Sequence, residues 1–195
     1  MKSQASMRLI LLMTLLAVAG MLPALHAFAA DQTDSDSHGY QEFHNRVEAY
    51  KKLHKKAEKS LPALKKKTAK QEVIAAHQQA LVDKLRELRN GARQGEIFTP
   101  AATVAIVRVI KDVFAGADAH RVKNTIQAGD PLQGFEVQVN QKYPESLPFT
   151  TVPPTLLQKL PGLPDDVGYR ILGSALLLVD RKANMIIDFM PNAIP

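Results

Sequence analysis

The residues best suited to hold a small polar ligand are Arg93, Gln94 and Glu96, which share a loop with Gly91 and Gly95. Together they offer a planar cation, an amide and a carboxylate, so the loop could bind a ligand through directed hydrogen bonds. The same groups could instead bond to the free backbone carbonyls where two helices end. We favour this structural role and keep the loop as a candidate binding site.

A row of lysines on the first predicted helix is the second candidate. Lys51, Lys55 and Lys59 are the binding residues we select from it; the row also contains Lys52 and Lys56, and Lys65 to Lys67 follow directly. Residues 46–93 hold 14 Lys and Arg against 5 Asp and Glu. Such an asymmetry hints at an anionic partner, and a solvated helix face is the alternative.

Neither a metal site nor a cofactor is predicted. The chain has no cysteine, which excludes thiol catalysis and cysteine-based zinc or iron–sulfur sites. His44 and His54 are ten residues apart on one helix, close to three turns, so they lie too far apart to share one metal ion. His77 falls on the apolar face of the second predicted helix, where a core or boundary histidine is expected.

No catalytic motif emerges from the remaining polar residues. Ser174 lies in a predicted turn between two strands, without the Gly-x-Ser-x-Gly elbow of a serine hydrolase. Asp165 and Asp166 follow a proline, as is usual in turns. Asp188 is expected to be exposed to solvent if the last strand lies at an edge of the sheet. The sequence therefore favours a protein without catalytic activity.

The first 30 residues have the pattern of a secretory signal peptide. Lys2 and Arg8 precede an apolar run over residues 9–22, and Ala27-Phe28-Ala29 suits a cleavage site. An uncleaved anchor is the alternative, but a membrane span needs about 20 apolar residues, and the run over residues 9–22 is shorter than that. We predict a mature chain in the periplasm or outside the cell, with no transmembrane span after cleavage. Without a cysteine, lipid attachment at the cleavage point is excluded.

The mature part is predicted to be one domain. Residues 31–39 form a short segment that is polar and acidic, which predicts a flexible leader. The domain then covers residues 40–195, with a helical half at 40–129 and a proline-rich segment and sheet at 130–195.

The third of four predicted helices is expected to be the most buried. Thr99 and Pro100 suit the N-cap and the first position of this helix. Its body is apolar on most sides, so Val107 and Ile110 should be buried, together with Leu178 of the sheet. Ile187 is expected in the same core.

The hydrophobic period changes in the second half of the chain. Alternation at residues 135–139 predicts one strand, and residues 167–172, 175–180 and 185–190 predict a three-stranded meander. The second strand of the meander is continuously apolar, which predicts a central strand covered on both faces. The fold class is therefore α+β, with N-terminal helices packed on a small antiparallel C-terminal sheet.

One segment resembles a known group of proteins. Residues 91–100 (GARQGEIFTP) look like an inter-helix linker of uncharacterised exported bacterial proteins. In those proteins too, a helical half precedes a proline-rich stretch and a closing hairpin. The closing turn, residues 178–188, also resembles the C-terminal hairpin of several small periplasmic proteins. The resemblance covers most of the mature chain and implies export, but no activity.

These observations favour a non-catalytic exported protein that contacts an envelope component, or an anionic lipid or polymer surface. Nucleic acid is not expected as a partner, since the aromatic side chains of the basic half, Tyr40, Phe43 and Tyr50, are assigned to the core. The alternative function is an enzyme of unrecognised type with its site at the loop Arg93–Glu96.

Overall fold

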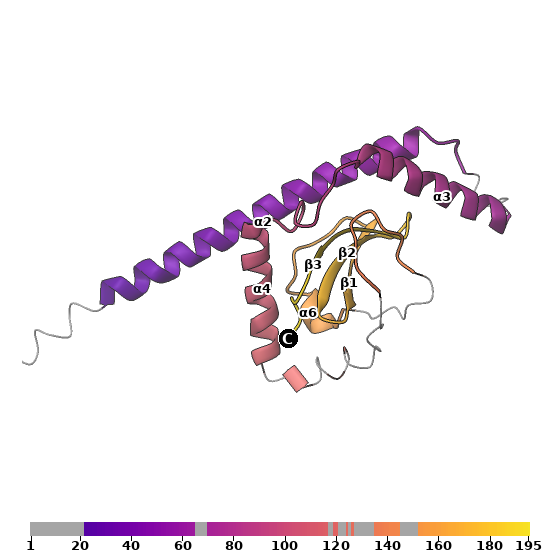
Figure 1. Cartoon of the computed structure of the whole chain (residues 1–195). Helices are drawn as coiled ribbons and strands as arrows, with labels where there is room; N and C mark the ends of the chain where they lie inside the picture. Colours follow the sequence, from indigo (N-terminus) through magenta and orange to yellow (C-terminus); the bar gives the residue numbers. More distant parts are fainter. Residues whose placement is uncertain are drawn as a thin grey trace, which may run out of the picture.

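The protein is described by a computed structural model of the 195-residue chain. Its backbone is described for residues 22–64, 70–116, 119–120, 124, 126, 135–144 and 152–195. Helices pack with a three-stranded antiparallel sheet in this structure, which confirms the α+β class (Figure 1). Most of the predicted fourth helix lies outside the described residues, and Lys65 to Lys67 lie wholly outside them.

The first described helix, α2, runs from Leu22 to Lys59 and so includes residues 31–39. The flexible leader predicted there is not what the structure shows. Gly39 lies directly against helix α4: a Cβ atom on it would come within 2.5 Å of the Ala101 carbonyl oxygen. Asp36 also forms an ion pair with Arg108. These tertiary contacts hold a polar, glycine-containing segment in a helix that its composition alone disfavours.

Helices α3 (Gln71–Leu88) and α4 (Pro100–Ala115) occur where the sequence predicts them. The Thr99 hydroxyl accepts a hydrogen bond from the Ala102 backbone N–H, as expected of an N-cap. Only one side of α4 is buried, however. Ile110 is fully buried, whereas Val107 is only half-buried and packs at the margin of the main core. The expectation that Val107 is buried was therefore wrong.

The sheet consists of β1 (Val167–Leu172), β2 (Ala175–Asp180) and β3 (Met185–Met190), at the predicted bounds. The strand order is β1-β2-β3, and every residue of the central strand β2 is buried. Leu176 and Leu178 face the cluster that includes the helices, while Leu177 and Val179 face a smaller cluster on the other side. The prediction of a central strand covered on both faces is confirmed.

The strand predicted at residues 135–139 is not present. Instead, residues 140–143 run beside β3, where the Asn140 backbone N–H bonds to the Ile186 carbonyl oxygen at 2.8 Å. A single bridge, between Lys142 and Met185, forms there. Asn140 has a φ of 64°, which interrupts the extended backbone that a strand requires. Short helix α6 (Pro154–Leu157) follows in the proline-rich segment.

Ile110 should matter more to stability than Val107. Because Ile110 is fully buried in the main core, we expect Ile110→Ala to lower the free energy of unfolding by about 2–4 kcal/mol. Val107→Ala should cost clearly less, since part of its side chain already faces water. Denaturant unfolding of both variants checks this, and equal losses would contradict the burial described here.

Candidate functional site

Two aspartates on the sheet are completely buried and together hold the helices to it. Asp180 ends β2, and Asp188 lies within β3. A buried carboxylate is costly unless each oxygen accepts hydrogen bonds. Both side chains meet this condition, with different partners.

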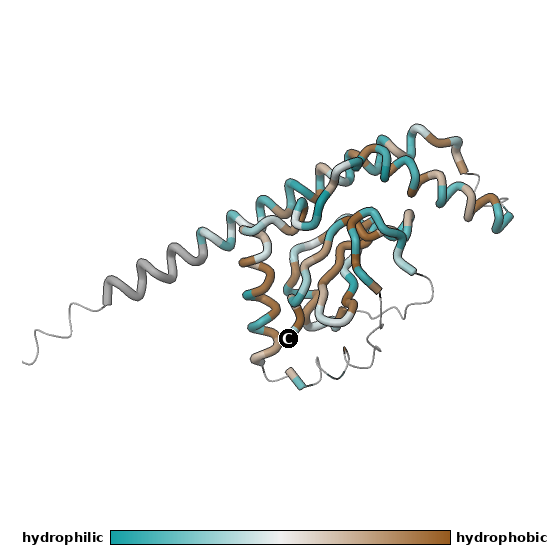
Figure 2. The backbone as a smooth tube through the Cα atoms, in the orientation of Figure 1, coloured by the Kyte–Doolittle hydropathy of each residue, from teal (hydrophilic) through white to brown (hydrophobic). Residues whose placement is uncertain are grey.

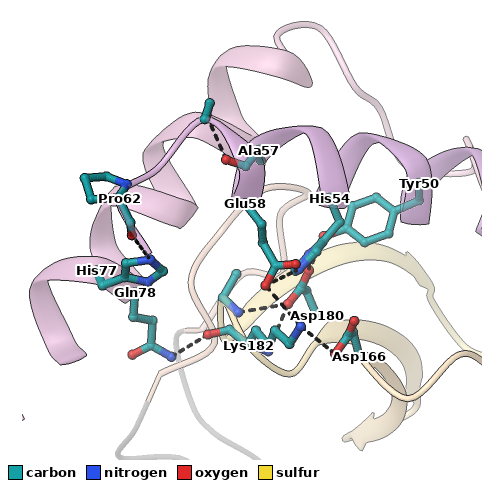
Figure 3. Close-up of polar contacts among 12 residues, drawn as sticks. Tyr50, His54, Ala57, Glu58, Pro62, His77, Gln78, Asp166, Asp180 and Lys182 are labelled. Carbon is teal, nitrogen blue, oxygen red and sulfur yellow. Dashed lines mark hydrogen bonds and ion pairs between the residues drawn. The ribbon is translucent and has the colours of Figure 1, made fainter. Parts of the chain in front are cut away.

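Asp180 bonds to two side chains of α2. Tyr50 Oη donates to Asp180 Oδ2 at 2.5 Å, and His54 Nδ1 lies 2.5 Å from the same oxygen (Figure 3). The other oxygen, Oδ1, accepts from the backbone N–H groups of Lys182 and Ala183. Tyr50 and His54 are four residues apart, so they project from the same face of α2 and reach one carboxylate.

His54 also approaches a second carboxylate, on its other side. Its Nε2 atom lies 3.5 Å from Glu58 Oε1. Lys182 Nζ bonds to the same Glu58 oxygen at 3.0 Å and lies 3.1 Å from Asp166 (Figure 3). We call Tyr50, His54, Glu58, Asp180 and Lys182 the histidine cluster. It joins the C-terminal part of α2 to the β2–β3 turn.

The electrostatics of the cluster favour an imidazolium at His54. Burial lowers the pKa of His54, but its hydrogen bond to Asp180 and the attraction of both carboxylates outweigh burial, so the pKa of His54 is raised. For Asp180, burial raises the pKa, yet the bonds from His54, Ala183 and Tyr50 leave it below its ordinary value. Both shifts favour the charged form of the Asp180–His54 pair.

This geometry suits a structural role better than catalysis. His54 is only 2 % exposed, and its Nε2 faces the Glu58 carboxylate instead of a nucleophilic hydroxyl. Burial and the negative charge of Asp180 raise the pKa of Tyr50, so its phenol stays neutral and serves as a donor. A general base needs access to a substrate proton, which this ring lacks.

The raised pKa of His54 predicts a pH dependence of stability. The imidazolium contributes fully below the ordinary histidine pKa of about 6.5, and the contribution is lost as pH rises through the raised pKa of the folded protein. We expect the free energy of unfolding, measured with urea at a series of pH values, to show this decline in the native protein and not in His54→Gln. The exposed His44 provides the control, since His44→Gln should keep the native profile.

Asp188 organises the loop that joins α3 to α4. Its Oδ1 accepts from the Gly95 N–H at 2.9 Å, and its Oδ2 accepts from Ile97 and Phe98 at 2.7 and 2.8 Å. The loop can aim these N–H groups at one point because Gly95 has a φ of 84°, a left-handed conformation. The expectation that Asp188 is exposed was wrong, because the loop covers its strand.

Arg89, just after α3, makes further contacts with the loop between α3 and α4 and with its surroundings. It is 6 % exposed and donates to the Asn140 side chain, to Glu96 and to the Ile187 carbonyl oxygen. Its guanidinium also lies 5.2 Å from the centre of the Tyr50 ring, a cation–π contact. Arg89 thereby connects α3, the following loop, β3 and α2.

The candidate loop Arg93–Glu96 is only partly brought into a concave site. Glu96 pairs with Arg89 at 3.1 Å and lines a cleft of about 320 Å³ that Arg46 and Tyr50 also line. Arg93 and Gln94 are exposed and are not among the cleft-lining residues. Asp188 and Arg89 hold this loop in place, which differs from the predicted hydrogen bonds between its own side chains and helix carbonyls.

The candidate lysines of α2 differ from one another. Lys51 is half-buried and pairs with Glu48 at 3.0 Å. Lys55 and Lys59 are exposed, and so are Lys52 and Lys56. None of these four forms an ion pair with an acidic residue in the part of the chain that the structure describes. We call Lys52, Lys55, Lys56 and Lys59 the lysine face.

Sequence reasoning missed the histidine cluster and Arg89. One signal was present: His54 follows Tyr50 by four residues on the apolar stripe of the first helix. A histidine there suggests a buried polar partner. Nothing local points to Asp180, because its partners precede it by 126 and 130 residues.

Among the residues that the structure describes, no three His, Asp or Glu side chains are arranged to hold a metal ion. Within the same residues, no helix is both long enough and apolar enough to cross a membrane. No protein-family model, curated protein or solved structure matches this chain.

Proposed function

We propose that this is a non-catalytic exported protein of the cell envelope that docks on an anionic surface through the lysine face. The observation that carries this proposal is the exposure of four lysines on one helix without ion-pair partners among the described residues. Anionic headgroups attract such lysines with about 1 kcal/mol for each cation near the surface.

The arrangement of the lysine face supports docking. Successive residues of an α-helix are rotated by about 100°, so Lys52, Lys55, Lys56 and Lys59 form one stripe. That stripe is opposite Phe43 and Val47, which are buried in the core. Since the core fixes the rotation of α2, all four cations point away from the domain body.

A second candidate is a small-ligand or catalytic site in the cleft beside Glu96. Arg46 and Arg89 line this cleft with Glu96, which offers charges of both signs. Arg89 already donates to three protein acceptors, however. This leaves fewer free donors for a ligand, so we place this candidate second.

Export is the part of the proposal that rests on residues 1–30 and on the resemblance to exported bacterial proteins. We expect the processed protein to begin at Ala30 or Asp31, which N-terminal sequencing of protein recovered from the envelope or medium will establish. Cleavage there would retain Asp36 and Gly39, and with them the contacts between α2 and α4. Exported protein that begins at Met1 would contradict the signal peptide.

Docking is tested by co-sedimentation with vesicles of phosphatidylglycerol mixed with phosphatidylcholine, and with phosphatidylcholine alone. Lys55→Gln/Lys59→Gln should weaken binding to the anionic vesicles by about 30-fold. The control Lys111→Gln/Lys159→Gln removes equal charge from exposed positions elsewhere and should have much less effect. Binding should also weaken with salt, because exposed charges are screened. Equal binding to both kinds of vesicle would contradict the proposal.

A further inference from the structure

We infer that the N-terminal end of α3 inserts into the headgroup–acyl boundary of an anionic bilayer, with Val73 and Ile74 as the inserted side chains. This inference rests on the proposed function and deepens it. It identifies the anionic surface as lipid instead of polymer, and adds an apolar contact to the electrostatic one.

Val73 and Ile74 are unusually exposed for apolar residues. They are 51 % and 43 % exposed, and they are adjacent in the first two turns of α3. The other large hydrophobic side chains exposed in the described part of the chain, Val104 and Leu157, are isolated on different helices. Scattered exposed apolar residues are normal, whereas neighbouring ones suggest a contact surface.

Ile74 is exposed although it lies on the core-facing side of α3. It precedes Leu81 by seven residues, or about two turns, so the two side chains project from the same face. Leu81 and Leu85 are buried, but the N-terminal half of α3 extends beyond the sheet (Figure 1). The apolar stripe therefore continues past the body of the domain, where Ile74 remains 43 % exposed beside Pro62 and Leu64.

A hollow beside Ile74 provides room for an apolar group. It has a volume of about 350 Å³, and its apolar lining includes Pro62, Leu64 and Leu81. Lys182 at its rim is bonded to Glu58 and lies close to Asp166. Because this cation is already balanced by carboxylates, the hollow favours apolar groups over anions.

The positive charges near Val73 and Ile74 favour an anionic lipid surface as the partner of this region. Lys70 lies one turn before Val73 and Ile74, and Lys59 ends α2; both are exposed. Figure 2 shows apolar and polar positions interspersed along the projecting part of α3. Exposed apolar side chains flanked by lysines are typical of segments that lie in a membrane interface. A soluble anionic polymer would use the lysines and leave Val73 and Ile74 in water.

A tryptophan placed at this site reports insertion directly, since the chain contains none. We expect the fluorescence of Ile74→Trp to shift to shorter wavelength when vesicles of phosphatidylglycerol and phosphatidylcholine are added. Val104→Trp, at a similarly exposed position on α4, should show no shift. Both variants are made in the full chain and compared with the same processed N-terminus, so any contribution of residues 1–30 is shared.

Removal of the apolar side chains gives an independent measurement. Val73→Ser/Ile74→Ser should weaken vesicle binding by about tenfold, whereas Val104→Ser/Leu157→Ser should leave it unchanged. If the protein sediments with anionic vesicles but Ile74→Trp shows no shift, this inference is overturned and the proposed function stands. If the protein does not sediment with anionic vesicles at any salt concentration, both fail. Binding to soluble polyglutamate as tight as to vesicles, and unaffected by Val73→Ser/Ile74→Ser, would also overturn insertion.

Discussion

Asp180→Asn is expected to lower the free energy of unfolding by about 3–5 kcal/mol, the usual cost of breaking a buried ion pair by removing one partner. The substitution keeps the size of the side chain but removes the negative charge that holds His54. It also replaces one acceptor oxygen by a donor, so the amide cannot satisfy all four groups that now donate to Asp180. Urea unfolding measures the loss.

A second readout separates this electrostatic effect from a general loss of packing. Without Asp180, burial should lower the pKa of His54 toward or below the ordinary histidine value, which an NMR titration of the folded variant measures. Asp112→Asn, at an exposed position on α4, is the matched control and should change neither quantity appreciably. A native His54 pKa in Asp180→Asn would show that Asp180 is not its main partner.

Asp188→Asn should lower the free energy of unfolding by about 3 kcal/mol. Each hydrogen bond to a charged acceptor contributes roughly 1.5–3 kcal/mol. Four backbone N–H groups donate to the two oxygens of Asp188, whereas an asparagine side chain has only one oxygen to accept them. The loop that contains Gly95 should also become mobile. Faster amide exchange at Ile97 and Phe98 will report this local change.

Asp83→Asn, on the exposed side of α3, is the control for Asp188→Asn because it removes the same charge from a solvated position. We expect it to leave both stability and amide exchange close to native. If Asp188→Asn costs no more than this control, the hydrogen bonds described for its carboxylate do not contribute to stability.

The regular elements could largely be predicted from the sequence. Turn residues such as Gly173 and Asn184, which have left-handed backbones in the structure, delimit three strands whose bounds were predicted correctly. Thr99 and Pro100 likewise marked the start of α4. These signals are local, because capping and turn formation involve residues that are close in the chain.

The errors concern features that depend on distant partners. A polar segment at residues 31–39 suggested a leader, but helix α4 packs against Gly39. Asp188 was expected to face solvent, but a loop about 90 residues earlier covers it. Alternation at residues 135–139 suggested a strand, whereas the left-handed Asn140 limits pairing to a single bridge. None of these partners can be identified from periodicity.

The same holds for the candidate site. The loop Arg93–Glu96 and the lysines were selected because their residue types stand out locally. The histidine cluster could not be assembled in this way, since Tyr50 and His54 come from α2 and Asp180 from β2. Composition reveals which side chains could carry charge, but only the tertiary structure shows which charges are balanced.

The two buried aspartates have a consequence for the order in which the molecule can form. Tyr50 and His54 are synthesised 130 and 126 residues before Asp180, and the loop that contains Phe98 is made 90 residues before Asp188. Until those carboxylates emerge, the helical half lacks the acceptors for its buried donors. Contacts of such long sequence separation slow folding. We therefore expect the closing strands to form late in folding, and the helices to stay open to rearrangement until those strands are in place.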